Sequence, residues 1–326
     1  MQAIVMTAAG EPEVLQPREA PEPHPEHGEI VVRTTAIPVL YAETLLRSGA
    51  FPMPAALPEI FGFQVTGSVA EIGAGVDPQL LGARVVATTA GTGAYAESAR
   101  VPAEFATPIP DGVSDDDAAA VLMGGSVAHA LLDRAALTGA ETVLVQVSTS
   151  GVGGYLTQLA RKFGAARVIA TASGDKADRA RALGADEVVD HRAPGWPQRL
   201  REILGDTTVD VVFDAFGGDT ARDLLEVMTP ATGRMLGYGQ LSGAPAAITP
   251  ADLALRGLTY TSCTGPAWLG RVAATRADVL DHAAAGLITP LIDRVLPLDE
   301  AARAHRLVQE RATTGTIILR PNRAVG

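Results

Sequence analysis

Apolar and polar residues follow two different rhythms along this chain. Up to residue 113, short apolar runs with a period near two are separated by Pro and Gly, which is typical of strands and turns. No regular alternation of helices and strands is visible there. This region is therefore predicted to be β-rich, with strands at Ala3–Met6, Glu29–Ala36, Thr66–Ile72 and Arg84–Ala87.

From Ser114 the pattern changes to alternating helices and strands. Asp115 to Asp117 suit a helix N-terminus, and the apolar run Ala118–Leu132 is too short to span a bilayer, so it is interpreted as a buried helix. Alternation of this kind predicts a doubly wound parallel sheet in an α/β domain. The expected strands are Val143–Val147, Val168–Ala172, Val209–Phe213 and Arg234–Tyr238.

After the helical stretch Trp268–Ala285, the chain is expected to return to the β-rich region. The segments that support this are a strand at Val295–Leu298, a helix at Glu300–Glu310 and a strand at Thr316–Leu319. The prediction is a first domain of residues 1–117 completed by 287–326, and a second domain of residues 118–286.

The segment from Val143 to Lys176 has the order strand, small-residue turn, helix, strand. In its turn, Gly151 and Gly153 would let the backbone approach a pyrophosphate, while the helix directs free N–H groups at it. Leu156 occupies the place of the third glycine of the full G-x-G-x-x-G motif, so the context carries the prediction. The alternative is an α/β unit that binds no nucleotide. The candidate cofactor-binding residues of the turn are Ser150, Gly151, Val152 and Gly153.

The end of the second strand bears on the choice of cofactor. NAD-binding proteins usually place Asp or Glu about 20 residues beyond the turn, to bind the ribose 2′-hydroxyl. Here Ser173 stands in that place, and Ser173, Lys176 and Arg192 could donate to a 2′-phosphate. The sequence therefore favours NADPH over NADH. Alternatively, Lys176 is only a solvent-exposed charge at the start of the helix at Ala177–Leu183.

Composition narrows the class of protein. A length of 326 residues with 47% hydrophobic content fits two cores. A net charge of −11 with no basic block argues against a nucleic-acid surface. With Cys263 as the one cysteine there is no internal disulfide, and no signal-peptide pattern is visible, so a cytoplasmic protein with no membrane partner is expected.

Several motifs in order carry a resemblance over nearly the whole chain: YAETLLRSGAFP at 41–52, FGFQVTGSVAEIGAGV at 61–76, GAYAESARVP at 93–102, the turn at 148–154, DVVFDAFGG at 210–218 and AAGLITPLIDRVLPLDEAARAHRLV at 284–308. They resemble the zinc-independent quinone oxidoreductase (zeta-crystallin-like) branch of the medium-chain dehydrogenase/reductase superfamily. The resemblance implies a GroES-like catalytic domain, a Rossmann cofactor domain with a cleft between them, NADPH as hydride source, a small-molecule substrate and a homodimer.

Zinc alcohol dehydrogenases of the same superfamily bind metal through Cys, His and Glu. Where those enzymes carry G-H-E, this chain reads Gly62, Phe63 and Gln64, and a single cysteine cannot build a tetrahedral thiolate site. His24 and His27 have HxxH spacing in a proline-rich loop, without further nearby ligands, and are expected to be solvated. No metal is predicted.

The chemistry that fits is transfer of a hydride from C4 of NADPH to a quinone or to the β-carbon of an enone. Relatives often have N-x-x-D where this chain has Leu40 and Glu43, and tyrosine where it has Phe51. A phenyl ring cannot donate a proton, so water or another group must do so. The candidate catalytic residues are Tyr41, Gln64 and His129. Each has a structural alternative. Tyr41 could pack against the cleft wall, and Gln64 has the same alternative of a structural role. His129 could be a core histidine whose hydrogen bonds are satisfied.

Loops at the carboxyl ends of parallel strands supply further candidates, because ligands bind at that edge of such sheets. By the resemblance, the loop after Phe213 approaches the adenosine ribose and the loop at 237–240 approaches nicotinamide. The alternative is that these glycines only allow the chain to turn after each strand. The candidates in these loops are Phe216, Gly237, Tyr238 and Gln240.

Three functions remain open at this point. The first is an NADPH-dependent quinone or enone reductase. The second reduces an enoyl thioester or another biosynthetic intermediate. The third is a dehydrogenase-derived binding protein or non-redox cyclase, suggested by Leu40, Phe51 and the bulky Val147 before the turn.

Overall fold

The computed structural model describes residues 1–50, 57–149 and 151–321. Their backbone divides into two compact units. Unit 1 comprises Met1–Leu122 and the chain from Leu280 onward, and unit 2 comprises Met123–Val279. The predicted domain boundaries, after residues 117 and 286, stay a proposal.

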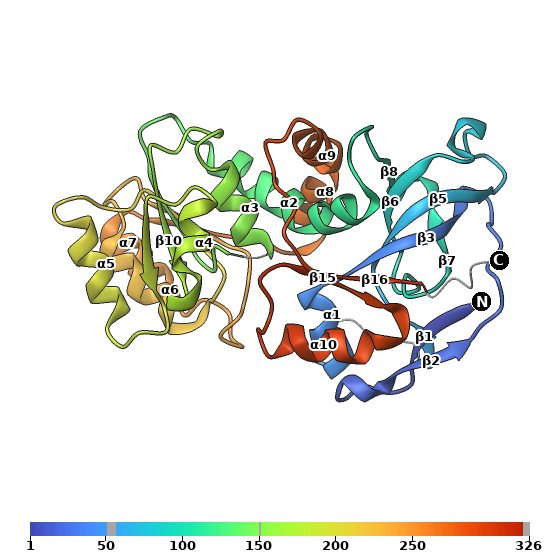
Figure 1. The fold of residues 1–326 in the computed structure, drawn as a ribbon. Helices are drawn as coiled ribbons and strands as arrows, with labels where there is room; N and C mark the ends of the chain where they lie inside the picture. The colour runs from blue at the N-terminus through green and yellow to red at the C-terminus, as the bar shows by residue number, and fades with distance from the viewer. Residues whose placement is uncertain (51–56, 150, 322–326) are drawn as a thin grey trace. The chain divides into compact units, whose positions relative to one another are not determined.

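Unit 1 contains the β-rich part of the chain (Figure 1). Its helices are α1 (Tyr41–Ser48), α10 (Ala301–Gln309), the first part of α2 (Asp115–Ala135) and the end of α9 (Arg276–Ala284), from Leu280. Its strands are β1 (Gln2–Met6), β2 (Leu15–Glu19), β3 (Glu29–Val39), β4 (Glu59–Ile60), β5 (Gln64–Ile72), β6 (Arg84–Thr88), β7 (Ser98–Pro102), β8 (Ala106–Pro108), β15 (Ile292–Pro297) and β16 (Thr316–Arg320).

The larger sheet of unit 1 is built around β3. Among the described residues its order is β15-β16-β3-β5-β6-β8, and β7 also pairs with β3. The C-terminal strand β16 lies antiparallel to β3, with Ile317 opposite Val39. Strands β15 and β16 thus belong to this sheet of unit 1. Helix α10 packs against α1, and Figure 1 shows the two side by side.

Unit 2 contains the alternating part of the chain. Its strands are β9 (Thr142–Val145), β10 (Arg167–Ala172), β11 (Glu187–Asp190), β12 (Val211–Asp214), β13 (Arg234–Gly237) and β14 (Thr259–Ser262). Its helices are the second part of α2, then α3 (Gly151–Leu159), α4 (Ala177–Ala182), α5 (Trp196–Leu204), α6 (Gly218–Leu224), α7 (Pro250–Arg256), α8 (Gly265–Ala274) and the start of α9, up to Val279.

The sheet of unit 2 has the order β11-β10-β9-β12-β13-β14, and every pairing in it is parallel. The predicted doubly wound α/β domain is confirmed. In this order the chain moves outward from β9 to β11 and then returns to β12 on the other side of β9. The strand order reverses between β9 and β12, which is where such sheets bind dinucleotides.

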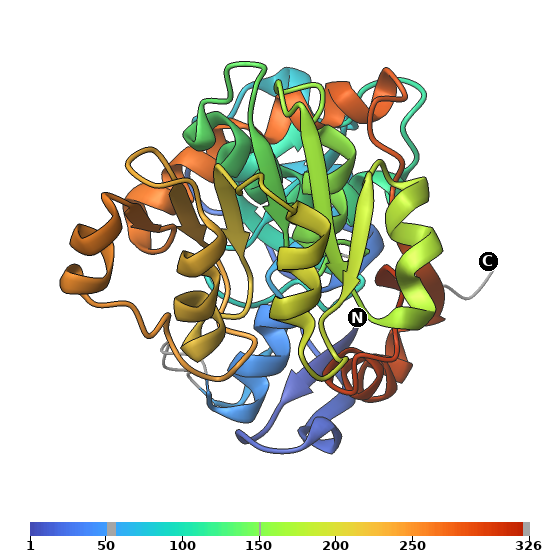
Figure 2. The same ribbon diagram turned by 90° about the vertical axis from the view of Figure 1, so that its left-hand side faces the viewer.

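Helices cover both faces of this sheet, which Figure 2 shows from the side of unit 2. On one face Leu144, Ile169 and Val212 lie in one row across three strands, in a core to which α5, α6 and α7 contribute. On the other face Ala170 packs with Ala180 of α4. Strands buried on both faces explain the unbroken apolar runs in the sequence.

Some elements were not predicted, namely strands β2, β4, β7, β8, β11 and β14. The predicted helical stretch Trp268–Ala285 forms two helices, α8 and α9, separated at Thr275, whose hydroxyl donates to the Val272 carbonyl at 2.9 Å. The run Ala118–Leu132 is a buried part of α2, as expected. In the part of the chain that is described, no helix is both long and apolar enough to cross a membrane.

Candidate cofactor site

The turn from β9 into α3 has a tightly constrained backbone. Val147 has φ +54° and Gly151 φ +53°, both in the left-handed region. A Cβ on Gly153 would stand 2.2 Å from the carbonyl oxygen of Val147, whereas one on Gly151 would meet nothing within 4 Å. Gly153 therefore allows α3 to pack against the end of β9, and Gly151 leaves open space. Ser150 lies outside the described residues.

Hydrogen bonds to neighbouring elements hold this turn. The Val147 amide donates to Thr171 Oγ1 at 3.2 Å, and the Ser148 amide donates to the Thr171 carbonyl at 3.0 Å. Arg179 donates through Nε to the Thr149 carbonyl at 3.1 Å. The helix that follows begins at Gly151, so its first amides, including that of Val152, have no partner within the helix and form a site for an anion.

The end of β10 brings together the three groups expected to bind a 2′-phosphate. The Ser173 hydroxyl donates to the carboxylate of Asp175, and this bond, together with the positive charges of Lys176 and Arg192, lowers the pKa of Asp175. Ser173 is buried and Asp175 is exposed. Lys176 and Arg192 thus lie near a carboxylate of the chain itself, and the role of the three groups in cofactor binding stays a prediction.

The junction between β9 and β12 is held by two buried polar side chains. Gln146 Oε1 accepts from the amides of Ala215 at 2.8 Å and Phe216 at 3.2 Å. Asp214 Oδ1 accepts from the amides of Phe216 and Gly217, each at 3.0 Å. Burial raises the pKa of Asp214. Together they fix the loop after β12 at the reversal of strand order.

The Phe216 ring lies edge-on to the ring of His191, with centroids 5.2 Å apart and planes at 62°. Phe216 follows β12 and His191 follows β11, two strands separated in the sheet by β9 and β10. The pair therefore bridges the strand ends on the side of the sheet that also carries Lys176 and Arg192.

The loop after β13 is closely packed. A Cβ on Gly237 would stand 2.4 Å from the Tyr260 hydroxyl, so this glycine has a packing role. The Tyr238 hydroxyl donates to the Gln146 carbonyl at 3.4 Å, and burial, then the charge of Asp214, raises its pKa. Gln240 is exposed.

The three candidate catalytic residues have different surroundings. Tyr41 is 39% exposed at the start of α1. Gln64 is fully buried, and its amide donates to the Ala119 carbonyl at 2.9 Å. His129 Nδ1 lies 3.3 Å from Asp133 Oδ2, and the His129 ring stands edge-on to Phe163. These contacts favour structural roles for Gln64 and His129 and leave the Tyr41 ring accessible. All three stay predictions.

Several contributors to this site were not predicted. They are Gln146, Thr171 and Arg179, whose side chains hold backbone of the two turns. A polar residue directly after an apolar strand is the one signal that could have pointed to Gln146.

No metal centre accompanies these groups. Within residues 1–50, 57–149 and 151–321, no three His, Cys, Asp or Glu side chains gather closely enough to hold an ion. His24 lies 3.3 Å from Glu71, with its side chain 80% exposed. The absence of a metal stays a prediction.

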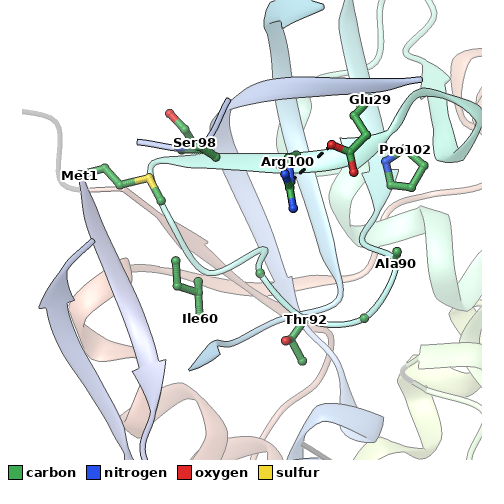
Figure 3. A pocket seen from close by; sticks show the side chains of 11 residues that line it. Met1, Glu29, Ile60, Ala90, Thr92, Ser98, Arg100 and Pro102 are labelled. Carbon is green, nitrogen blue, oxygen red and sulfur yellow. Dashed lines mark ion pairs between the residues drawn. The ribbon is translucent and has the colours of Figure 1, made fainter. Parts of the chain in front are cut away.

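A separate pocket of about 270 Å³ lies in unit 1 (Figure 3). Figure 3 shows Arg100 pointing toward Glu29, and the two form an ion pair at 3.4 Å. Arg100 also pairs with Glu26 at 2.7 Å. Its charge is thus neutralised by the chain's own carboxylates, and the pocket offers no further group that indicates a ligand.

A parallel sheet in this strand order, with an anion site at the reversal point and cations at the end of β10, defines a dinucleotide-binding protein. Comparisons with known proteins agree. A family model described as "Alcohol dehydrogenase GroES-like domain" matches residues 26–111, and one described as "Zinc-binding dehydrogenase" matches residues 183–319.

The chain is 32% identical to quinone oxidoreductase 1 of Escherichia coli K12, over 96% of this chain and 97% of the relative. It is 30% identical to 2-haloacrylate reductase of a Burkholderia species, over 98% of each. The structure of Escherichia coli quinone oxidoreductase complexed with NADPH has a TM-score of 0.89 and 32% identity, covering 98% of this chain and 100% of that one. The chain belongs to the quinone oxidoreductase family of the medium-chain dehydrogenase/reductase superfamily.

Proposed function

We propose that this protein is an NADPH-dependent, metal-independent oxidoreductase that transfers hydride to a quinone or to the β-carbon of an α,β-unsaturated carbonyl compound. Its relative in Escherichia coli has been solved as a complex with NADPH, which supports the cofactor. The observation on this chain that carries the proposal is the grouping of Ser173, Lys176 and Arg192 at the end of β10.

The residues present fit NADPH. The open space beside Gly151 and the free amides at the start of α3 suit the pyrophosphate. Lys176 and Arg192 would hold the 2′-phosphate. By family resemblance, Phe216 would border the adenosine ribose and the loop at 237–240 would border nicotinamide. When bound, NADPH supplies a hydride from C4 of its nicotinamide ring.

Reduction of either acceptor also requires a proton at the oxygen that gains charge. Tyr41 has an accessible ring, and its hydroxyl has no hydrogen-bond partner among the described residues. Gln64 cannot release a proton, and His129 is buried with its ring edge-on to Phe163. We therefore propose Tyr41 as the proton donor, with water as the alternative. Phe51, which stands where relatives often have tyrosine, lies outside the described residues.

The likeness to a 2-haloacrylate reductase favours one further acceptor class, electron-poor alkenes that bear a carboxylate. An assay of NADPH consumption by purified protein against quinones, enals, 2-haloacrylate and an enoyl thioester, with NADH alongside, separates these classes. Turnover of a quinone or enone supports the proposal. Tight NADPH binding with no consumption in the presence of any acceptor would favour the non-redox function instead.

We also propose a cytoplasmic homodimer. Strand β14 has one neighbour, β13, among the described strands, so its outer edge is available to a second copy. Sedimentation of the purified protein would measure the oligomeric state.

A further inference from the structure

A buried chain of polar side chains lies in unit 1, close to Tyr41 in sequence but separate from the cofactor site. It consists of Glu43 in α1, Tyr95 in the loop before β7 and His305 in α10, each fully buried. The Tyr95 hydroxyl donates to Glu43 Oε2 at 2.7 Å and lies 3.1 Å from His305 Nε2. Three chain segments distant in sequence are therefore joined through one hydroxyl group.

Glu43 also binds two backbone amides. Its Oε2 accepts from the Leu40 amide at 2.8 Å, and its Oε1 accepts from the Phe63 amide at 2.7 Å. Leu40 directly precedes Tyr41, and Phe63 directly precedes Gln64 at the start of β5. One carboxylate thus fixes the start of α1 relative to the start of β5.

Aromatic rings enclose this chain. Phe61, Tyr95 and His305 stand edge-on to one another with centroids 5.5 to 5.8 Å apart. Gly62 has φ +97°, and a Cβ there would stand 2.1 Å from the Tyr95 ring, so glycine is needed for this packing. These hydrogen bonds stabilise the core, since a buried carboxylate without partners would cost several kcal/mol.

We propose that Glu43 is a positioning residue, whose carboxylate holds Tyr41 and the entry of β5 in the geometry used for hydride transfer. This inference rests on the proposed function, because Tyr41 matters only if it serves the reaction. A carboxylate can accept all three hydrogen bonds, whereas a protonated carboxyl loses acceptor capacity on one oxygen. Protonation of Glu43 should therefore loosen the start of α1.

The charged groups around Glu43 determine when that happens. Burial raises its pKa to about 7, against the lowering effect of the Leu40, Phe63 and Tyr95 hydrogen bonds. Burial, then the charge of Arg47, lowers the pKa of His305 to about 3, so that ring stays neutral. Arg47 in α1 donates to the Gly10 carbonyl and to Gln309 of α10. Burial lowers the pKa of Arg47, and the charge of Glu11 acts in the opposite direction. Glu43 is thus the group of the network that titrates near neutral pH.

The test is the pH profile of kcat for NADPH oxidation with the best acceptor. For wild type, kcat should be about tenfold lower at pH 6 than at pH 8, following the ionised fraction of Glu43. Tyr95→Phe removes a donor that lowers the pKa, so the midpoint should rise by about one pH unit. Glu43→Gln should have a low kcat with no midpoint in this range, and Glu43→Asp should restore part of the rate together with a midpoint.

A matched control is Glu141→Gln in unit 2. Glu141 is another buried carboxylate that accepts from backbone amides, at Thr138, Gly139 and Ala140. This variant should lose stability and keep the wild-type pH profile. If Glu43→Gln also kept the wild-type rate and profile, the positioning role would be wrong. If Glu43→Gln does not fold, an unshifted midpoint in Tyr95→Phe would contradict it equally.

A readout without turnover separates this inference from the proposed function. The Glu43 carboxyl carbon and the Tyr41 ring can be followed by NMR as the pH is changed. Both should shift with one midpoint near 7 even if no acceptor is ever consumed. A Tyr41 signal that is independent of the Glu43 titration would overturn the inference, whereas absent NADPH oxidation at every pH would overturn the proposed function alone.

Discussion

Gly153 lies directly beneath the carbonyl oxygen of Val147, so close that a Cβ on Gly153 would stand 2.2 Å from it. The glycine permits the first turn of α3 to pack on the end of β9. Because the carbonyl oxygen of Val147 is a backbone atom, it cannot move aside as the end of a flexible side chain would. This close approach therefore contributes to the direction in which the α3 amides point.

Gly153→Ala should displace the start of α3 and weaken NADPH binding by about tenfold or more, about 1.4 kcal/mol, with a loss of stability of about 1–3 kcal/mol from overpacking. Fluorescence titration and chemical unfolding measure the two effects. Gly270→Ala in α8, where a Cβ would meet nothing within 4 Å, is the control. It should leave NADPH binding unchanged and gain up to about 1 kcal/mol of stability.

Lys176→Ala should weaken NADPH binding by about 1–3 kcal/mol and leave NADH binding unchanged, because the lost charge acts on the 2′-phosphate. Lys162→Ala, at an exposed position after α3, should change neither affinity. Calorimetric titration of each variant with both cofactors measures this. An equal loss for NADPH and NADH would rule out the role assigned to Lys176.

Val147→Gly should raise the free energy of unfolding by about 1 kcal/mol, since the left-handed backbone conformation costs a residue with a Cβ about 1–2 kcal/mol. The Val147 side chain is partly exposed, so little burial is lost. Val145→Gly, at a buried strand position, should instead lose about 2 kcal/mol or more. Urea unfolding of the two variants measures these changes in the free energy of unfolding. Destabilisation of both variants by similar amounts would contradict the strain at Val147.

Glu43 also makes stability depend on pH. Its folded pKa of about 7 lies above its ordinary value of 4.5, so its contribution to stability is fully present below pH 4.5 and is lost as pH rises through about 7. The advantage of wild type over Glu43→Gln should therefore shrink by about 3 kcal/mol across that range.

His305 acts in the opposite sense, because its folded pKa of about 3 lies below the ordinary 6.5. Its contribution is lost as pH falls from 6.5 through 3. Comparing wild type with Glu43→Gln at each pH cancels this term. A gap in unfolding free energy that stays constant between pH 4.5 and 7.5 would show that Glu43 does not titrate in the folded protein as described.

Much of the fold could be predicted because burial dictates it. Apolar runs such as Val143–Val147 mark strands covered on both faces, and they appear as β9 and its neighbours. Strand β7 (Ser98–Pro102) was missed because it carries Ser, Arg and Pro in five residues, and its place beside β3 is decided by pairing across the sheet rather than by local pattern.

The site could be predicted only where a residue type itself carries the chemistry. Lys176 and Arg192 follow from charge, whereas Gln146 and Arg179 hold backbone atoms that only the folded chain brings near them. Gly153 was predicted for approach to a pyrophosphate, and the structure gives it a packing contact with Val147. Tyr95, which bonds Glu43, lies 52 residues further along the chain, and His305, which contacts Tyr95, lies 210 residues beyond that, so no local pattern reaches them.

The most direct test of hydride transfer without metal is a single-turnover reaction of chelator-treated enzyme. Its complex with NADPH is mixed rapidly with a quinone or an enone, and the loss of NADPH absorbance is followed with ordinary cofactor and with cofactor deuterated at C4. We expect NADPH to be oxidised after chelation, and more slowly when C4 carries deuterium. Loss of the reaction on chelation, or no oxidation of bound NADPH by any acceptor, would contradict the account.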